Sequence, residues 1–423
     1  MPETKEDVID QPLQDLNNDG VDRRGFLKCM AWAGTGLVWT LNGGIPVSQA
    51  FAKGHDKRAK GADFTFAQIS DSHIGFNKPA NPDVTATLQT AINKINALPD
   101  KPDFILHTGD LSHLSKPSEF DTLDQTLKSA SAKQIFYVPG EHDMLTDNGE
   151  QYLQRYGKGT KGSGWYSFDH KGVHFAGLVN VANLKAGGLG SLGHEQLEWL
   201  EDDLKSQGTS TPIVLFAHIP LWTVYPEWGW GTDDSEQALS YVKRFGSVTV
   251  LNGHIHQVMQ KVEGKVSFHT AMSTAFPQPA PGSAPSAGPM KVPAEQLQKV
   301  LGIRDVRYVV SGTSLAIVDS PLDSSESAGA AATSAAASAA SDSDVKIDNF
   351  AFTPTPLTVK TGTQVTWTNR DDIPHTVDST QGKFKSSALD TDQKFQFRFS
   401  EAGEYPYFCR LHPKMTGSVM VKS

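Results

Sequence analysis

Cysteine is nearly absent from this chain of 423 residues, which contains Cys29 and Cys409 and no others. Long basic runs are also missing, and the formal net charge is −9, so the sequence offers no face for binding nucleic acid. Apart from the N-terminal region, no stretch is long and apolar enough to cross a bilayer. The length leaves room for two or three domains. We therefore expect a globular protein of several domains.

The N-terminal region is typical of an export segment. Residues 22–28 read DRRGFLK, a moderately apolar stretch follows, and Ala50-Phe51-Ala52 offers a small-residue cleavage site. This arrangement resembles a twin-arginine signal peptide. The alternative is a membrane anchor, but Asn42 and Pro46 interrupt the apolar stretch. We predict that residues 1–52 are removed and that the mature protein is periplasmic, with Cys409 as its single thiol.

The region 62–322 alternates short apolar runs with amphipathic stretches, which predicts an α/β domain. Leu197, Leu200 and Leu204 have helical spacing, and Pro82 suits the first turn of a helix. The predicted helices are 83–98 and 194–205, and the predicted buried strands are 64–69, 104–107, 134–138, 213–216 and 248–251.

Two low-complexity segments divide the rest of the chain. Residues 277–293 are rich in Pro, Ala, Gly and Ser and predict a long loop, whereas 323–344 contain almost nothing to bury and predict a linker. Residues 345–423 alternate β-branched and aromatic positions between turns. This pattern predicts a small all-β sandwich.

Acidic and histidine residues follow each predicted strand of the first domain. Because the carboxyl ends of strands in α/β sheets are where sites form, we expect these residues to converge. They offer carboxylate and imidazole ligands, which suit Fe, Mn or Zn. In chain order they are Asp71, His73, Asp110, Glu141, His142, Asp143, His218, His254 and His256.

These motifs resemble those of the calcineurin-like metallophosphoesterase superfamily over residues 64–275. Gly188-Leu189-Gly190 and the helix 194–205 are similar to members related to cyclic-nucleotide phosphodiesterases. The resemblance implies an α/β sandwich with helices outside. It also implies a first metal held by Asp71, His73, Asp110 and His256, and a second held by Asp110, Glu141, His218 and His254.

The resemblance further implies hydrolysis of a phosphomonoester or phosphodiester by a hydroxide that bridges the two metals. His142 is the expected proton donor, and Asp143 its expected orienting partner. Glu141 departs from the family pattern, which has a neutral asparagine there. A glutamate that binds metal lowers its Lewis acidity and repels phosphate, and one that turns away removes a ligand. Either outcome predicts an altered metal preference or weaker turnover.

Other residues near these motifs leave alternatives open. His107 is expected to pack in the core, whereas His113 either reaches the site mouth or lies in a solvated loop. His269 lies near the cleft by its place in the sequence. The remaining candidates either form a substrate wall or pack their own loop: Trp222, Trp228 and Trp230.

The C-terminal region carries a second set of ligands, namely His375, Cys409, His412 and Met415. Two imidazoles, a thiolate and a thioether form the ligand set of blue copper, in which a weak axial Met lies off a trigonal plane. Residues 345–423 resemble cupredoxins, nearest to amicyanin and plastocyanin. A copper ligand also explains the lone thiol.

Together these features predict an exported two-metal phosphoesterase with a tethered type 1 copper domain for electron transfer or copper sensing. Its partners would be a phosphate-ester substrate and a redox protein. The alternative is a copper-binding electron-transfer protein whose phosphoesterase domain binds metal but is weakly active.

Overall fold

The computed structural model describes residues 36–42, 45–51, 63–309, 315–323 and 343–423. The chain divides into two compact units, Met1–Arg58 and Ala59–Ser423. In the first unit, strands β1 (Gly36–Asn42) and β2 (Ile45–Phe51) pair antiparallel. The rest of the predicted export segment and most of the predicted linker lie outside the described residues. Within the described residues, none of the helices combines the length and apolarity that a membrane span requires.

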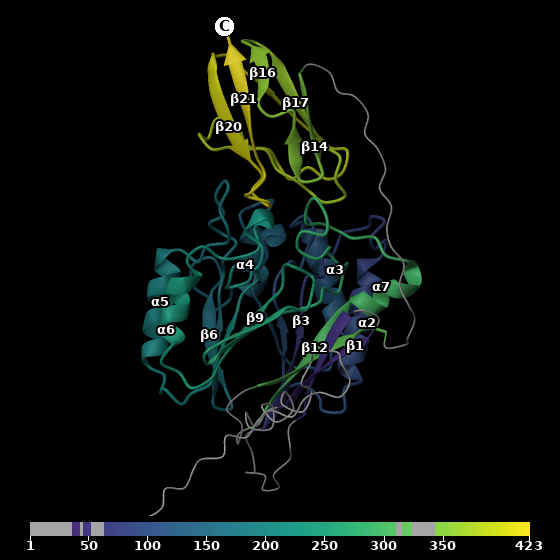
Figure 1. Cartoon of the computed structure of the whole chain (residues 1–423), viewed down its shortest axis with the longest axis vertical. Helices are drawn as coiled ribbons and strands as arrows, with labels where there is room; N and C mark the ends of the chain where they lie inside the picture. Colours follow the sequence, from purple (N-terminus) through teal and green to yellow (C-terminus); the bar gives the residue numbers. More distant parts are fainter. Residues whose placement is uncertain (1–35, 43–44, 52–62, 310–314, 324–342) are drawn as a thin grey trace, which may run out of the picture. The chain divides into compact units, whose positions relative to one another are not determined.

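Two sheets form the centre of the first large domain (Figure 1). The larger sheet has the strand order β10-β11-β9-β8-β7-β6, and the smaller has the order β13-β12-β3-β4-β5. The bounds in the larger sheet are β6 Tyr166–His170, β7 Val173–Gly177, β8 Ile213–Phe216, β9 Val248–Asn252, β10 Gln260–Glu263 and β11 Val266–Thr270. Those in the smaller sheet are β3 Phe64–Ile69, β4 Ile105–His107, β5 Ile135–Tyr137, β12 Gly302–Tyr308 and β13 Ala316–Pro321.

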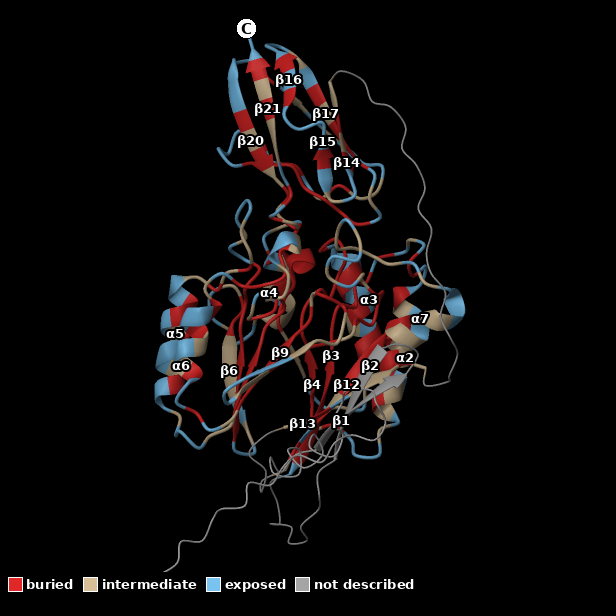
Figure 2. Cartoon of the chain, in the orientation of Figure 1, coloured by how far each residue is buried: buried red, intermediate tan, exposed pale blue. Residues whose placement is uncertain are grey.

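An apolar core rich in phenylalanine joins strands of the two sheets. Phe66 of β3 stacks on Phe104 at 5.0 Å between ring centroids and meets Phe175 of β7 edge-on at 5.5 Å. Phe216 of β8 and Leu251 of β9 belong to the same buried cluster. Each fully buried side chain of this size contributes about 1.5–3 kcal/mol. Strands β3, β4 and β9 are buried throughout (Figure 2), which explains their continuous apolar runs.

Helices cover the outer faces of both sheets. The apolar side chains of α2 (Val84–Asn96) and α3 (Pro117–Leu127) pack with those of the smaller sheet, whereas α5 (His194–Lys205) and α6 (Ser235–Val242) pack with those of the larger. The α/β sandwich is thereby confirmed. The remaining elements are α4 Glu150–Tyr156, α7 Ala294–Val300, and the short helices η1 Glu141–Met144 and η2 Pro226–Trp228.

The predicted elements agree closely with the observed ones, with one local correction. Helix α2 begins at Val84, and the Asp83 side chain accepts a hydrogen bond from the Ala86 amide at 3.0 Å. Pro82 therefore precedes the N-cap residue rather than occupying the first turn. The carboxylate satisfies an amide that the helix leaves free, so the cap determines where the helix starts. The proline-rich segment 277–293 forms no helix or strand, as expected.

Residues 343–423 form the predicted β-sandwich of two four-stranded sheets, with orders β15-β14-β17-β19 and β16-β21-β20-β18. Trp367 of β17 is fully buried and meets Tyr407 of β20 edge-on at 5.5 Å, which joins the two sheets. The strands are β14 Asp344–Asp348, β15 Ala351–Thr353, β16 Leu357–Lys360, β17 Gln364–Asn369, β18 Asp378–Ser379, β19 Lys394–Arg398, β20 Gly403–Phe408 and β21 Thr416–Lys422.

Candidate metal centres

The acidic and histidine blocks of the first domain lie immediately after β3, β4, β5, β8 and β9, as expected. Five of their residues have left-handed backbone, with φ of +54° at Asp71, +39° at His73, +50° at Asp110, +71° at His254 and +55° at His256. Such backbone costs about 1–3 kcal/mol per residue and persists only where surrounding structure enforces it. Its concentration here indicates a site rather than a set of ordinary loops.

Two glycines of these motifs are required by close packing. A Cβ at Gly140 would lie 2.0 Å from Oδ1 of Asp110, and one at Gly253 would lie 2.0 Å from Oγ of Ser70. Neither contact is tolerable, so glycine lets the strand-end loops approach one another.

Asp71, His73 and His256 form one part of the site. Nε2 of His256 lies 3.3 Å from Oδ1 of Asp71 and 3.3 Å from Nε2 of His73. Nε2 of His73 also lies 3.5 Å from Oδ2 of Asp110. These donor atoms converge closely enough to hold one cation.

Glu141, His218 and His254 form the other part. Oε1 of Glu141 lies 3.0 Å from Nδ1 of His254, and its Oε2 lies 3.1 Å from Nε2 of His218. The same His218 nitrogen is 3.3 Å from Oδ2 of Asp110. The Glu141 side chain therefore turns into the site rather than away from it. Asp110 Oδ2 lies between the two parts, as a bridging carboxylate requires.

The charged side chains of the site strongly affect one another's pKa values. Burial, together with the charge of Glu141, raises the pKa of Asp110 well above its usual value. Burial opposes ionisation of Glu141, yet His254 and His218 hold its pKa well below normal. Although burial opposes protonation of His218, Asp110 and Glu141 raise its pKa well above 6.5. The buried acidic side chains of Asp71, Asp110 and Glu141 need positive charge beside them, which bound cations would supply.

Backbone carbonyls orient two of the imidazoles. Nδ1 of His218 lies 2.7 Å from the Thr108 carbonyl, and Nδ1 of His256 lies 2.6 Å from the Phe276 carbonyl. When these nitrogens donate, each Nε2 is left free to bind metal. Sequence reasoning missed both partners, because a backbone carbonyl leaves no side-chain signal.

The surroundings of His142 differ from the expectation. Its Nδ1 lies 2.8 Å from the His113 carbonyl rather than against Asp143. The Asp143 carboxylate instead accepts hydrogen bonds from the Gly140, Leu111 and Ser112 amides and from the Ser112 hydroxyl, at 2.8–3.0 Å. Asp143 thus joins the loops after β4 and β5, because its acceptor oxygens are taken up by backbone donors. Burial lowers the pKa of His142 to about 4.

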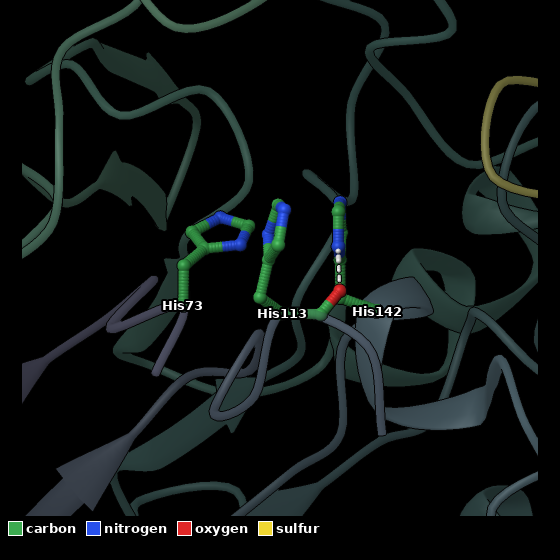
Figure 3. Close-up of side chains that lie close together, drawn as sticks. All are labelled: His73, His113 and His142. Carbon is green, nitrogen blue, oxygen red and sulfur yellow. Dashed lines mark hydrogen bonds between the residues drawn. The ribbon is translucent and has the colours of Figure 1, made fainter. Parts of the chain in front are cut away.

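His113 occupies neither of the positions considered for it. Its side chain is 1% exposed, so it lies in no solvated loop, and it is not among the residues that line the site cavity. Figure 3 shows its ring beside those of His73 and His142. His107 is buried as expected, and its Nε2 contacts the Ser72 hydroxyl at 2.8 Å. His269 is also buried and lies outside the cavity lining.

A cavity opens over the site. It is lined by His73, Asp110, Glu141, His142 and His254. Trp228 and Trp230 line it as well, whereas Trp222 packs against Phe268 at 5.2 Å. The three tryptophans therefore divide between the two roles considered for them. Other lining residues come from the proline-rich loop (Gln278, Ala287, Gly288) and from the C-terminal domain (Phe350, Ile373, Leu411, His412, Pro413).

The C-terminal domain brings three of its four predicted ligands together. Sγ of Cys409 lies 3.7 Å from Nδ1 of His375 and 3.6 Å from Nδ1 of His412, and the two nitrogens are 3.1 Å apart. Three ligands about 2.0–2.3 Å from a shared cation give edges of about 3.5–3.8 Å. The two sulfur–nitrogen distances fit this range, and the nitrogen–nitrogen distance is shorter. Met415 is buried in the same cluster as Cys409.

Outer contacts hold this triangle in place. Nε2 of His375 pairs with Oδ2 of Asp371 at 2.8 Å, which leaves Nδ1 for the metal. The Thr376 amide donates to Cys409 Sγ at 3.3 Å. Burial opposes protonation of His375, but Asp371 and Cys409 raise its pKa to about 9. Burial opposes ionisation of the Cys409 thiol, yet contact with His375 lowers its pKa, which favours the ligating thiolate.

Comparison with known proteins agrees with both sets of ligands. The profile of the calcineurin-like phosphoesterases matches residues 64–258, and that of the cupredoxin-like domains matches 327–421. The chain carries a calcineurin-like metallophosphoesterase domain and a C-terminal cupredoxin domain. Both expected families are thereby confirmed, and the donor sets described above fit the metals that these families imply.

Individual relatives match one domain each. Amicyanin of Paracoccus versutus is 35% identical over 83 residues, which is 18% of this chain and 63% of that protein. A probable glycerophosphodiester phosphodiesterase of Arcobacter nitrofigilis is 25% identical over 224 residues, covering 49% of this chain and 77% of that protein. A serine/threonine-protein phosphatase of Danio rerio is 27% identical over 226 residues, covering 46% and 70% respectively. The chain thus spans less than two thirds of the amicyanin.

Proposed function

We propose that this protein is an exported hydrolase that cleaves a phosphomonoester or phosphodiester at a two-metal site. The observation that carries the proposal is the position of Asp110, whose Oδ2 lies within 3.5 Å of one histidine from each part of the site. When bound, two divalent ions activate water and neutralise phosphoryl charge. Fe, Mn and Zn all suit these ligands.

The chain's own residues supply the remaining chemistry. The His142 ring lines the cavity, and its Nδ1–H is held by the His113 carbonyl. Nε2 is therefore the atom that would take up a second proton from solvent and give it to the leaving oxygen. Trp228, Trp230 and Ile219 add apolar surface to the cavity. Such surface suits a substrate with an organic group on the phosphate, which agrees with esters rather than inorganic polyphosphate.

The C-terminal domain is proposed to bind one copper ion and transfer electrons. Support comes from the sulfur and imidazole triangle around Cys409 and from the Thr376 amide that donates to the sulfur. Within the unit Ala59–Ser423, His412 lines the same cavity as Glu141 and His142. On this proposal, the charge of the ion held by His412 differs between the two redox states and changes the rate at the hydrolytic site. Comparing hydrolysis rates of the oxidised and reduced protein tests this link, and equal rates would contradict it.

Replacement of Asp110 by alanine tests the hydrolase. The variant loses the shared carboxylate, and with it several kcal/mol of transition-state stabilisation, so turnover should fall about 10³-fold. The assay uses a chromogenic phosphodiester with Mn²⁺, and the visible copper band checks that the rest of the protein is intact. Equal turnover in the variant and the parent would reject the proposed site.

A second function is favoured by Glu141. Its carboxylate contacts His218 and His254 and adds negative charge where phosphate would bind. On this alternative the protein is a copper electron-transfer protein whose larger domain holds metal with little turnover. A blue copper band together with no hydrolysis of mono- or diesters under Mn²⁺, Fe²⁺ or Zn²⁺ would favour it.

A further inference from the structure

We propose that His73, His113 and His142 form an additional transition-metal position, which shares His73 with the two-metal set and is separate from the copper site. It would take one borderline divalent cation, Zn²⁺ or Cu²⁺. His113 belongs to neither ligand set described above, so this position depends on a residue with no other assigned role.

The geometry supports a shared ligand. One nitrogen from each of the three rings lies within 4.8 Å of the others. The ring centroids are 4.6 Å apart for His73 and His142, 5.2 Å for His113 and His142, and 5.7 Å for His73 and His113 (Figure 3). Three imidazoles bound to one cation have nitrogens about 3.3–3.5 Å apart, so small ring rotations would close the site.

The hydrogen-bonding state of these rings is the second observation. Both ring nitrogens of His113 and Nδ1 of His73 are buried without a hydrogen-bond partner. Leaving a buried polar group unsatisfied costs about 1–3 kcal/mol. Apolar packing alone does not explain why position 113 is a histidine. A ring without nitrogens would pack equally well against Phe76, which contacts the His113 ring edge-on. A cation would satisfy Nδ1 of His73 and one of the two His113 nitrogens together.

The ligand chemistry defines the ion. Imidazole favours Cu²⁺ and Zn²⁺ over Mn²⁺ and Fe²⁺. His73 directs Nε2 toward Asp110 and the two-metal set, so a cation on its Nδ1 makes this ring a bridging imidazolate and releases the Nδ1 proton to solvent. His73 and His142 line the cavity, which gives the ion an entry path and water a place as fourth ligand.

Occupation would have a direct effect on catalysis. A His142 nitrogen that binds a cation is no longer available to give a proton to the leaving group. The position would therefore act as an inhibitory metal site in excess Zn²⁺ or Cu²⁺. This consequence rests on the proposed hydrolase, whereas the existence of the site does not.

The test compares His113→Phe with the parent full-length protein. Phenylalanine retains the stacked ring but removes the ligand, and His269→Phe is the matched control because His269 is buried, has an unpartnered Nδ1 and lies outside the cavity lining. Zn²⁺ bound at equilibrium dialysis is counted for each protein. We expect His113→Phe to bind one Zn²⁺ fewer than the parent and His269→Phe to bind the same number as the parent.

Inhibition provides the second measurement. The Zn²⁺ concentration that halves diester hydrolysis should rise at least tenfold in His113→Phe. Equal Zn²⁺ counts in parent and variant would overturn the proposal. If turnover is absent in all proteins but one Zn²⁺ is still lost, the site stands and the hydrolase proposal fails. Should His113→Phe not fold, His113→Asn with His269→Asn as control gives the same comparison.

Discussion

In the N-terminal domain, seven side chains reach the proposed two-metal site from five separate strand ends, whereas three of the four proposed copper ligands lie within the loop between β20 and β21. Five residues of the first site have left-handed backbone, and none of the four copper ligands does. The first centre therefore depends on strands of both sheets, and the second depends mainly on one loop and His375. A substitution that disturbs the strand ends should therefore affect the first centre more than the second.

The largest difference is expected for Gly140→Ala. The new Cβ would lie 2.0 Å from Oδ1 of Asp110 and displace the shared carboxylate. We expect loss of bound metal from the two-metal site and a fall in turnover of about 10²-fold or more, with the blue copper band retained. Gly208→Ala is the control, because its nearest neighbour is Thr211 Oγ1 at an ordinary 3.7 Å. Full metal content in Gly140→Ala would show that the loops adjust easily.

Replacing His142 by glutamine should be the next largest effect, and it depends on the substrate. Loss of a positioned proton donor costs about 10²–10⁴-fold in rate. The full loss is expected for an alkyl ester, whose leaving group needs a proton, and little loss for a p-nitrophenyl ester. The measurement is kcat for both esters. Equal losses for the two would exclude His142 as the donor.

Glu141→Asn should increase turnover rather than reduce it. Removing a negative charge beside His218 and His254 strengthens the pull of the bound cation on phosphate, so kcat on a diester should rise about tenfold. Bound metals, measured by elemental analysis, should change in ratio. Glu227→Gln, at an exposed position in η2, is the matched control. Unchanged kinetics and metal content would show that Glu141 is neutral in this site.

The smallest effect is expected in the copper-free C-terminal domain. His375 has a pKa raised to about 9, so the stability that its charge provides is complete below pH 6.5 and is lost as pH rises through 9. Asp371→Asn removes the partner carboxylate and should reduce this fall by about 1–3 kcal/mol. Urea unfolding at several pH values measures how far the free energy of unfolding falls with pH in each protein. Cys409 titrates in both proteins, so parallel curves for parent and variant would contradict the role of Asp371.

Side-chain motifs predicted most of both centres, because strand periodicity places Asp71, Asp110 and His218 just after the carboxyl ends of strands, whatever the details of the loops. Two features could not be predicted: hydrogen bonds from ligands to backbone carbonyls, and contacts between residues that are far apart in the sequence. The Thr108 and Phe276 carbonyls orient two ligands without any side-chain signal. His113 is buried because two loops approach each other closely. The residues next to His113 in the sequence do not predict this approach. The export segment stays a prediction.

Asp143 also has a wider consequence. Its carboxylate ties the loop that carries Asp110, the proposed bridging ligand, to the loop that carries His142, the proposed proton donor. Metal bridging and proton delivery are separate chemical tasks, but here the loops that carry them out are held by the same carboxylate. Substitutions at the two positions should therefore be non-additive, with a double variant losing less than the product of the single losses. The rate of this enzyme would then be a property of a clamped pair of loops rather than of independent residues.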